Sequence, residues 1–427
     1  MNHKERIIKT VAEICRLLTG CVFVFSGFVK AIDPTGFAIK IEDYLTAFGL
    51  QDFKPLALLA SINLGAVEFT LGVCVLLGVY RRYMSILVLL VMLVMTPLTL
   101  YLALFNPVSD CGCFGDAVIL SNWATFYKNI VLLSAAVFVL IHNQKLYQCF
   151  TFNIYWFVVL FVYVYCVGFS WWNYNHLPLI DFRPYKIGAN IPEQMTIPGD
   201  APHDACESVF IYEKDGVKKE FTLDNYPAND SSWTFVDAHT KLAAGGIRPR
   251  IETFNVYDND NDNRDVSDVI LYNEEPILLL IAHKLEEASD ERIDEINNLY
   301  DYALERRIPF YCITGSAQKY IQAWIDITGA EYPFLFADDV LLKTIIRSNP
   351  GLVLIKNGTV LKKWHYNDIP EEENIDKAVS GYLEEKPAND EGNRWIYINL
   401  SGFTVPLLLV WAYDYLHFRR RKEFENE

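Results

Sequence analysis

The sequence predicts an α-helical membrane protein that carries a large water-soluble α/β domain. The 427-residue chain is 52% hydrophobic, yet its formal net charge is −16, and such averages usually combine two unlike parts. Six stretches are apolar over the roughly 20 residues that a membrane-spanning helix needs. Between the fifth and sixth stretches, apolar strand patterns alternate with helical patterns over residues 277–365, which is typical of an α/β domain.

The six apolar stretches are interpreted as transmembrane helices. The first contains Glu13 and Arg16, and no small-residue cleavage site follows it, so it does not read as a cleavable signal. The last is the weakest, because Asn399, Ser401 and Asp414 dilute it. In chain order the stretches are Ile7–Ile32, Leu56–Val79, Met84–Phe105, Trp123–Ile141, Phe152–Ser170 and Trp395–Leu416.

Basic residues near the helix ends predict the orientation of the chain. If all six stretches span, four basic groups fall on one side, so both termini are expected in the cytoplasm of a bacterial inner membrane. The periplasmic side then receives residues 33–55, the loop 110–116 and residues 171–393. The basic groups are Lys4 to Lys9, Arg81 with Arg82, His142 with Lys145, and Arg419 to Lys422.

The character of the chain changes after Trp171. Residues 173–205 are rich in proline and polar residues and read as a linker, and a β-rich segment with a Lys-Asp-Gly hairpin turn follows it. The α/β part comes next. Its expected strands are Ile277–Ala282, Phe310–Thr314, Pro333–Ala337, Leu352–Lys356 and Val360–Trp364, and its expected helices are Glu287–Arg307, Gln318–Thr328, Asp339–Arg347 and Glu371–Glu384.

The stretch SNPGLVLIKNGTVLKKW resembles the end of the thioredoxin/peroxiredoxin-like fold, with Pro350 in the place of that fold's cis-proline. The resemblance implies a cis Asn349–Pro350 bond. The C-x-x-C that thioredoxins carry after the first central strand is absent, because ILLLIAHKLEEASDE holds no cysteine. Without a thiolate at that position the domain is expected to be redox-inactive by itself. Cys312 is interpreted as a buried core thiol, and Cys206, near the linker, as the more accessible one.

The run DNDNDNRD at residues 258–265 alternates oxygen-bearing side chains as a calcium-binding loop does. It lacks the glycine at the sixth position and the acid at the twelfth that an EF-hand loop requires. A solvated turn between strands is therefore expected, and no metal site.

The motif DCGCFGD at residues 110–116 lies between the third and fourth apolar stretches. A disulfide between Cys111 and Cys113 would close a very small ring, which the intervening glycine tolerates best. Strain would make that bond easier to reduce and hence more oxidising. Asp110 and Asp116 are expected to raise the pKa of both thiols by like-charge repulsion.

Three interpretations of the motif remain open on these residues: a redox-active pair, a structural disulfide or simple free thiols, and metal ligands. Two soft sulfurs with two carboxylates match no common metal site well. Phe114 and Gly115 would allow the loop to lie against the face of the bilayer.

Glu68 lies deep within the second apolar stretch, where a charge usually faces the bundle interior and has a partner. Measured along the helices from Arg81 and from Arg6, Glu68 and Arg16 lie at similar depths, so their side chains are expected to meet. The pair would be a structural ion pair, or it would handle protons or contact a quinone.

The first 145 residues resemble the DoxX/MauE-like family of four-helix membrane proteins. The resemblance is carried by ICRLLTGCVFVFSGFVKAIDP, by GAVEFTLGVCVLLGVYRR and by CGCFG, the last being closest to the methylamine-utilisation protein MauE. It implies a role in maturing disulfides of a periplasmic enzyme subunit, or in quinone-coupled sulfur oxidation. Fusion to a thioredoxin-like periplasmic domain is similar to proteins of Bacteroidota. Nothing in these residues supports methylamine metabolism specifically.

The expected domain order follows from these patterns. It comprises a four-helix DoxX/MauE-like bundle (1–145), a fifth transmembrane helix (146–172), a linker (173–205), a β-rich segment (206–256), a thioredoxin-like domain (257–390), a sixth transmembrane helix (395–416) and a basic cytoplasmic tail (417–427).

Two functions remain open. In the first, Cys111 and Cys113 catalyse thiol–disulfide exchange with periplasmic client proteins, and the Pro350 edge binds the client. Lipid-soluble quinone is the natural electron acceptor, although the sequence shows no quinone signature. In the second, the chain is a non-catalytic membrane scaffold whose periplasmic domain docks a partner. The negative net charge and the lack of a long basic face exclude nucleic acid as a partner.

Overall fold

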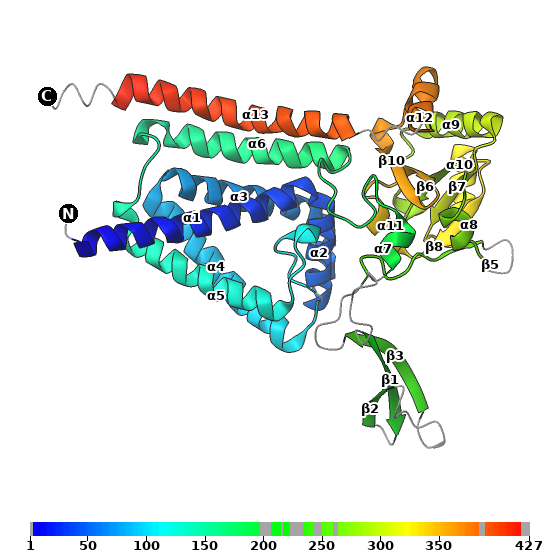
Figure 1. The fold of residues 1–427 in the computed structure, drawn as a ribbon, viewed down its shortest axis with the longest axis horizontal. Helices are drawn as coiled ribbons and strands as arrows, with labels where there is room; N and C mark the ends of the chain where they lie inside the picture. The colour runs from blue at the N-terminus through cyan, green and yellow to red at the C-terminus, as the bar shows by residue number, and fades with distance from the viewer. Residues whose placement is uncertain are drawn as a thin grey trace. The chain divides into compact units, whose positions relative to one another are not determined.

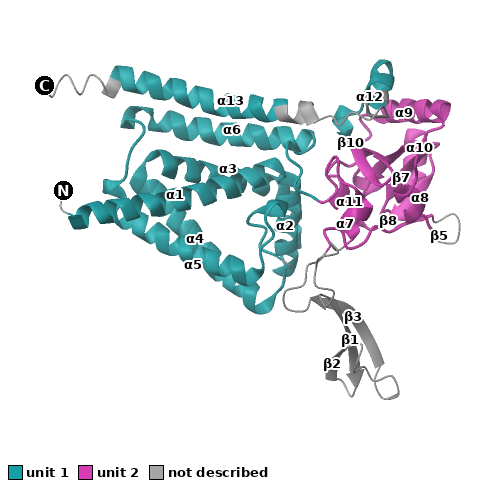
Figure 2. Ribbon diagram, in the orientation of Figure 1, with its two compact units in different colours: residues 1–183, 364–427 teal, residues 184–363 magenta. Residues whose placement is uncertain are grey.

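The computed structural model describes residues 3–108, 110–196, 206–214, 217–222, 234–242, 249–258, 264–383 and 389–419 (Figure 1). The chain divides into two units, residues 1–183 with 364–427 and residues 184–363 (Figure 2). Most of the DNDNDNRD run, residues 259–263, and the basic tail from residue 420 lie outside the described residues.

Long helices make up the first unit. They are α1 (His3–Ile32), α2 (Pro34–Ala47), α3 (Ala57–Leu77), α4 (Arg81–Phe105), α5 (Asn122–Ile141), α6 (Tyr155–Asn175), α12 (Ile375–Leu383) and α13 (Asn389–Asp414). Among the described residues, five helices are long and apolar enough to cross a membrane, which indicates a multi-pass membrane protein. These five are Gln51–Leu77, Arg81–Phe105, Asn122–Ile141, Phe152–Asn175 and Arg394–His417.

α1, which the sequence predicts as a further membrane-spanning helix, is not among these five. It is a 30-residue helix with an apolar C-terminal half, and its inner charges Arg16 and Lys30 are buried against α3 and its neighbours. α4 has the opposite character. Leu90 and Val94 are 52% and 67% exposed, whereas Val88 and Met92 on the other face are buried. An exposed apolar stripe of this kind is what a lipid-facing helix presents.

Close backbone contact sets the register between α1 and α3. A Cβ atom added to Gly27 would lie 2.4 Å from the backbone nitrogen of Phe69, and one added to Gly72 would lie 2.5 Å from that of Val24. Glycine therefore lets the two backbones touch, as small residues do between membrane helices. The contacts place Gly27 beside Gly65 and Gly20 beside Gly72, so the two helices run antiparallel.

The second unit is centred on a mixed sheet of seven strands in the order β10-β9-β6-β7-β8-β4-β5. β6, β7 and β8 are parallel, and β9 pairs with β6 in the antiparallel sense. The strands are β4 (Val256–Asp258), β5 (Arg264–Asp265), β6 (Ile277–Ala282), β7 (Phe310–Thr314), β8 (Phe334–Ala337), β9 (Gly351–Lys356) and β10 (Thr359–His365). The helices are α7 (Ile191–Met195), α8 (Ser267–Leu271), α9 (Ile293–Arg306), α10 (Gln318–Thr328) and α11 (Asp339–Ile345).

The β-rich segment is a separate three-stranded antiparallel sheet in the order β2-β1-β3. Its strands are β1 (Cys206–Lys214), β2 (Val217–Thr222) and β3 (Thr234–Leu242). β1 and β2 form the hairpin that the Lys-Asp-Gly turn predicts, since Lys214 pairs with Val217. The side chain of Cys206 lies outside the described residues, so its expected accessibility stays a prediction.

The cis Asn349–Pro350 bond is confirmed. Two expectations for the second unit are wrong. α9 begins at Ile293, because residues 285–287 form a short 3-10 helix and the backbone N–H of Ser289 donates to the carbonyl of Asn349. The stretch expected as a linker is partly packed, since Tyr185 and Ile191 are buried and the N–H of Ile191 donates to Gly358.

Candidate functional site

The Cys111 and Cys113 sulfurs lie 2.7 Å apart in the loop between α4 and α5. Both cysteines are free thiols, and Cys111 is buried whereas Cys113 is half-buried. Gly112 between them has φ of +66°, a conformation that side-chain-bearing residues rarely adopt. A Cβ atom there would also lie 3.2 Å from Cγ of Lys40. Glycine is thus what allows the two sulfurs to face each other.

α2 holds the Cys111 side of the loop. Lys40 and Tyr44 are four residues apart and share one helix face. The Lys40 ammonium lies 2.8 Å from Asp110 Oδ2, and the Tyr44 hydroxyl donates to the Cys111 carbonyl at 3.1 Å. Asp110 Oδ1 in turn accepts a 2.8 Å hydrogen bond from the N–H of Gly112. The Asp110 charge is therefore matched by Lys40.

A buried polar cluster of Ser26, Lys30 and Glu68, hereafter the Lys30 cluster, holds the Cys113 side. Ser26 and Lys30 are one turn apart on α1, and Glu68 comes from α3. The Lys30 ammonium lies 2.5 Å from Glu68 Oε2 and donates to Ser26 Oγ at 3.0 Å. Ser26 Oγ lies 2.8 Å from Glu68 Oε2 and 2.7 Å from the Cys113 carbonyl, so its single proton can reach either oxygen.

Phe114 and Gly115 close the loop against the helices. The Phe114 ring packs on Phe25 of α1 with centroids 5.3 Å apart, and the Lys128 ammonium of α5 lies 4.2 Å from the Phe114 centroid. Gly115 has φ of +49° and lies close to Val29, and Asp116 follows it in a short 3-10 helix. Lys128 thereby lies near enough for its charge to act on both thiols.

The surroundings lower the pKa of Cys113 to about 6. The hydrogen bond from the Cys111 thiol has the largest effect; burial opposes it, and the Lys128 and Lys30 charges add to it. The pKa of Cys111 is raised, first because it shares its proton with Cys113 and then because it is buried. The expectation that the flanking carboxylates raise both pKa values is wrong for Cys113, because the hydrogen bond from Cys111 lowers its pKa and the Lys128 and Lys30 charges lower it further.

The expected contact between Arg16 and Glu68 is also wrong. Arg16 pairs with Glu13 at 2.7 Å and donates to the Leu76 carbonyl at 2.9 Å. The register of α1 on α3 sets Arg16 beside the end of α3, about two helical turns from the level of Glu68. Depth counted from the flanking basic residues misses this offset. The structure brings Glu68 to the loop and leaves Arg16 at the far end of α3.

Three of the other described cysteines are placed as packing residues. Cys74, Cys166 and Cys312 are buried, and burial raises the pKa of the Cys312 thiol. His283 directly follows β6 and lies 4.0 Å from Asp339. Burial lowers the pKa of His283 to about 4. The described side chains of this unit thus offer no exposed thiol.

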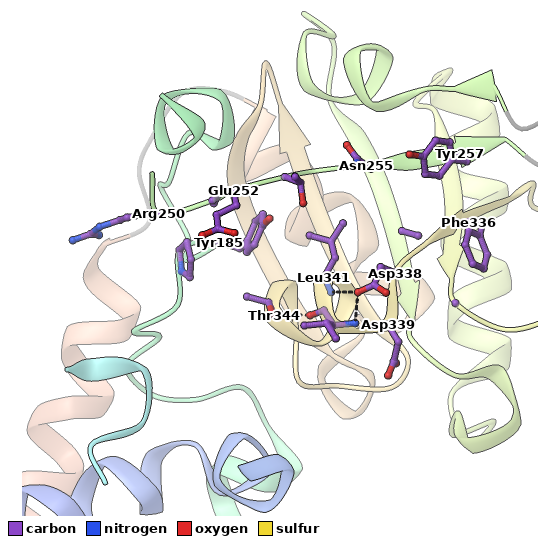
Figure 3. A pocket seen from close by; sticks show the side chains of 16 residues that line it. Tyr185, Arg250, Glu252, Asn255, Tyr257, Phe336, Asp338, Asp339, Leu341 and Thr344 are labelled. Atoms are coloured by element: carbon purple, nitrogen blue, oxygen red, sulfur yellow. Dashed lines mark hydrogen bonds between the residues drawn. The ribbon is translucent and has the colours of Figure 1, made fainter. Parts of the chain in front are cut away.

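A pocket of about 650 Å³ lies within the second unit, between the 250–257 segment and the start of α11 (Figure 3). Tyr185, Glu252, Tyr257 and Phe336 are among its 16 lining residues, none of which is a cysteine. Asp338, which also lines the pocket, is the N-cap of α11: its carboxylate accepts hydrogen bonds from the N–H groups of residues 340 and 341. Among the described residues, no group of three or more His, Cys, Asp and Glu side chains could hold a metal ion.

Five residues of the loop site escape sequence reasoning as site residues: Ser26, Lys30, Lys40, Tyr44 and Lys128. Lys128 could have been singled out from the sequence, because a lysine inside an apolar helix usually has a functional or structural partner. Lys30 carried the same signal within its apolar half-helix. Nothing in the sequence marks Ser26, Lys40 or Tyr44 as site residues, since their roles depend on which helices surround the loop.

The fold and the paired thiols define a multi-pass helical membrane protein with a cysteine pair in one of its loops. Residues 8–142 match the family model "Methylamine utilisation protein MauE", so the N-terminal part of the chain is a MauE-like membrane domain. Residues 206–244, which include the three-stranded sheet, match "Domain of unknown function (DUF8463)". No curated protein matches the chain.

Proposed function

We propose that the chain is a membrane thiol–disulfide oxidoreductase whose redox centre is the Cys111–Cys113 pair. The observation that carries the proposal is the pair itself: two free sulfurs 2.7 Å apart, one of them favoured as a thiolate, in a loop between two membrane-spanning helices. A thiolate is the form that exchanges with disulfides. The clients are secreted or periplasmic proteins, and the protein resides in a bacterial inner membrane with both termini in the cytoplasm.

Client oxidation starts from the Cys111–Cys113 disulfide. A client thiolate attacks Cys113 Sγ, and Cys111 leaves and takes up a proton; Cys113 is the less buried residue of the pair. A second client thiolate then attacks the client sulfur of the mixed disulfide, and Cys113 leaves as a thiolate. Its low pKa makes Cys113 a good leaving group in this second step. The client loses two electrons, and the pair gains them.

The pair must be oxidised again before the next turnover. A lipid-soluble quinone can accept the two electrons, and the position of the loop at the ends of α4 and α5 supports access from the bilayer. The Lys30 cluster lies on the bundle side of the pair and offers a polar surface there.

The second unit would bind the client without exchanging sulfur. Its strand order, its cis Asn349–Pro350 bond and its strand–helix alternation support a thioredoxin-like fold. Among its described side chains the cysteine is Cys312, which is fully buried. The edge around Pro350 is the part of such a domain that would contact an extended client chain.

Trapping of mixed disulfides tests the proposal. In Cys111→Ser the loop disulfide cannot form, so client oxidation should stop. Its free Cys113 thiolate should instead attack the disulfides of oxidised clients, release one client thiolate and hold the client as a mixed disulfide, because Cys111 is no longer present to displace it. A reductant should release these clients on a gel. Cys113→Ser should trap none and should abolish client oxidation. Cys21→Ser, which removes an exposed thiol on α1, is the matched control and should behave as wild type. Client oxidation that persists in Cys113→Ser would refute the proposal.

A scaffold role is the second candidate, and the buried state of Cys312 favours it, because a docking domain needs no reactive thiol. Replacing both Cys111 and Cys113 by Ser separates the two. If client oxidation is lost because the doubly substituted chain itself is depleted from the membrane, the scaffold role is supported. If client oxidation is lost while the amount of the chain is unchanged, the oxidoreductase role is supported.

A further inference from the structure

The charges around Cys113 come from every element that packs on the loop. Most of them are paired: Lys30 with Glu68, and Lys40 with Asp110. Among the described residues, Lys128 faces the Phe114 ring and has no carboxylate partner. The titratable and charged groups near the pair are Lys30 on α1, Lys40 and Tyr44 on α2, Glu68 on α3, Lys128 on α5, and Asp110, Cys111 and Asp116 in the loop.

The redox state of the pair changes this charge balance. With Cys113 as a thiolate, its negative charge offsets the positive charge of Lys128. When the disulfide forms, the thiolate charge disappears, and Lys128 remains unmatched in a partly buried site. Two unit charges at short range attract each other more strongly in a protein interior than in water. The loss of the thiolate charge therefore matters most where water is excluded. The surroundings therefore favour the reduced pair.

We infer that Lys128, supported by Lys30, is a positioning residue that stabilises the reduced pair and so makes the Cys111–Cys113 disulfide an oxidant of client dithiols. The inference rests on the proposed function and adds the residues that set the reduction potential of the pair. A disulfide becomes a stronger oxidant when its reduced form is stabilised. Lys128 would thus favour electron flow from client to loop, the direction that the proposed function requires.

The net step balances in atoms and charge. The client dithiol and the loop disulfide give the client disulfide, the Cys111 thiol, the Cys113 thiolate and one proton released to water. Two electrons pass from the client sulfurs to the loop sulfurs. Of the two client protons, Cys111 takes up one, and the other is released to water because Cys113 remains a thiolate.

The geometry fixes this electrostatic arrangement. Lys30 is 3% exposed and bonded to both Glu68 and Ser26, so its ammonium cannot swing into water without breaking the Lys30 cluster. The close approach of α1 and α3 at Gly27 keeps Lys30 and Glu68 at one level. Lys128 is held over Phe114, the residue that follows Cys113. A preorganised charge of this kind acts without rearrangement during the exchange.

The test is the equilibrium of the full-length protein, in detergent or nanodiscs, with defined ratios of reduced and oxidised glutathione. Alkylation and mass spectrometry then give the oxidised fraction of the pair. Lys128→Met should shift the equilibrium constant about tenfold toward the disulfide, which corresponds to a reduction potential about 30 mV lower. Lys128→Arg should restore most of the wild-type value. Lys145→Met, at the other end of α5, is the matched control and should leave the equilibrium unchanged.

A second variant tests the support from Lys30. Lys30→Met alone would leave Glu68 as a lone charge inside the bundle, which is destabilising, so it is combined with Glu68→Gln. The folded double variant should shift in the same direction as Lys128→Met, but by less, since one positive and one negative charge are lost together.

The outcomes separate the inference from the proposed function. If the wild-type pair does not exchange with glutathione at all, the proposed function fails and the inference fails with it. If the wild-type pair exchanges and folded Lys128→Met keeps the wild-type equilibrium, or shifts toward the dithiol, the inference alone is overturned.

Discussion

Cys113 has contacts within its own loop and with two helices that pack on the loop. Its carbonyl contacts Ser26 of α1, its sulfur contacts Cys111, and Lys128 of α5 lies over the next side chain. The neighbouring Cys111 is buried and its pKa is raised, whereas the pKa of Cys113 is lowered, so the two thiols differ in how readily they ionise. Such a separation of the pKa values of two neighbouring groups is how sites assign different roles to identical side chains.

The pH dependence of alkylation follows from the lowered pKa of Cys113. Because its pKa is about 6, the thiolate dominates at pH 7 and disappears as the pH falls through 6. The reaction of the reduced protein with iodoacetamide should therefore rise between pH 5 and 7 and level off above that range. Cys113→Ser should remove this phase, and a phase centred near the ordinary thiol pKa of about 8.5 would contradict the assignment.

For single residues, the sequence predicts that the two cysteines lie close together, but it does not predict which side chains surround them. Cys111 and Cys113 are neighbours in the chain, so their proximity needs no tertiary information. The partner of Glu68 depends on the register of α1 against α3, which the sequence does not display. Counting residues from helix ends therefore selected Arg16, whereas the glycine contacts select Lys30.

Among the elements, the α1–α3 pair is the one on which the site depends. Gly27→Ala should force a methyl group against the Phe69 backbone and separate the two helices, at a cost of about 1–3 kcal/mol. The thermal unfolding midpoint in detergent should fall, and the Lys30 cluster should loosen with it.

Gly168→Ala on α6 is the matched control, since no atom lies within 4 Å of its added Cβ. It should leave the midpoint unchanged or raise it, because alanine favours a helix over glycine. Equal destabilisation by both substitutions would show that the close contact at Gly27 is not what matters.

Strands were easier to predict than helix starts. β6 and β7 begin and end where the apolar runs do, because a fully buried strand is apolar throughout. α9 begins later than the helical pattern does, since Ser289 bonds to Asn349 across the unit instead of to its own helix. Tyr185 and Ile191 likewise look like linker residues in sequence, and they are buried only because the sheet edge receives them.

For the whole molecule, the testable feature is its orientation in the membrane. If the cysteine loop and the second unit face the periplasm, Tyr272→Cys, at a side chain that is 61% exposed, should react with an impermeant maleimide in intact spheroplasts. Tyr147→Cys, at an exposed position in the turn between α5 and α6, should react only after the membrane is permeabilised. The reverse labelling pattern would place the loop in the reducing cytoplasm and remove the basis for client oxidation.

The origin of the charges around Cys113 has a consequence for any attempt to move this chemistry elsewhere. Lys30, Glu68 and Lys128 belong to three different helices, and the seven residues DCGCFGD supply none of them. A synthetic peptide of that sequence, or the same seven residues grafted onto a foreign hairpin, would carry the two sulfurs and lose the helix charges that act on Cys113. What could be transplanted is the bundle with its loop, and not the motif.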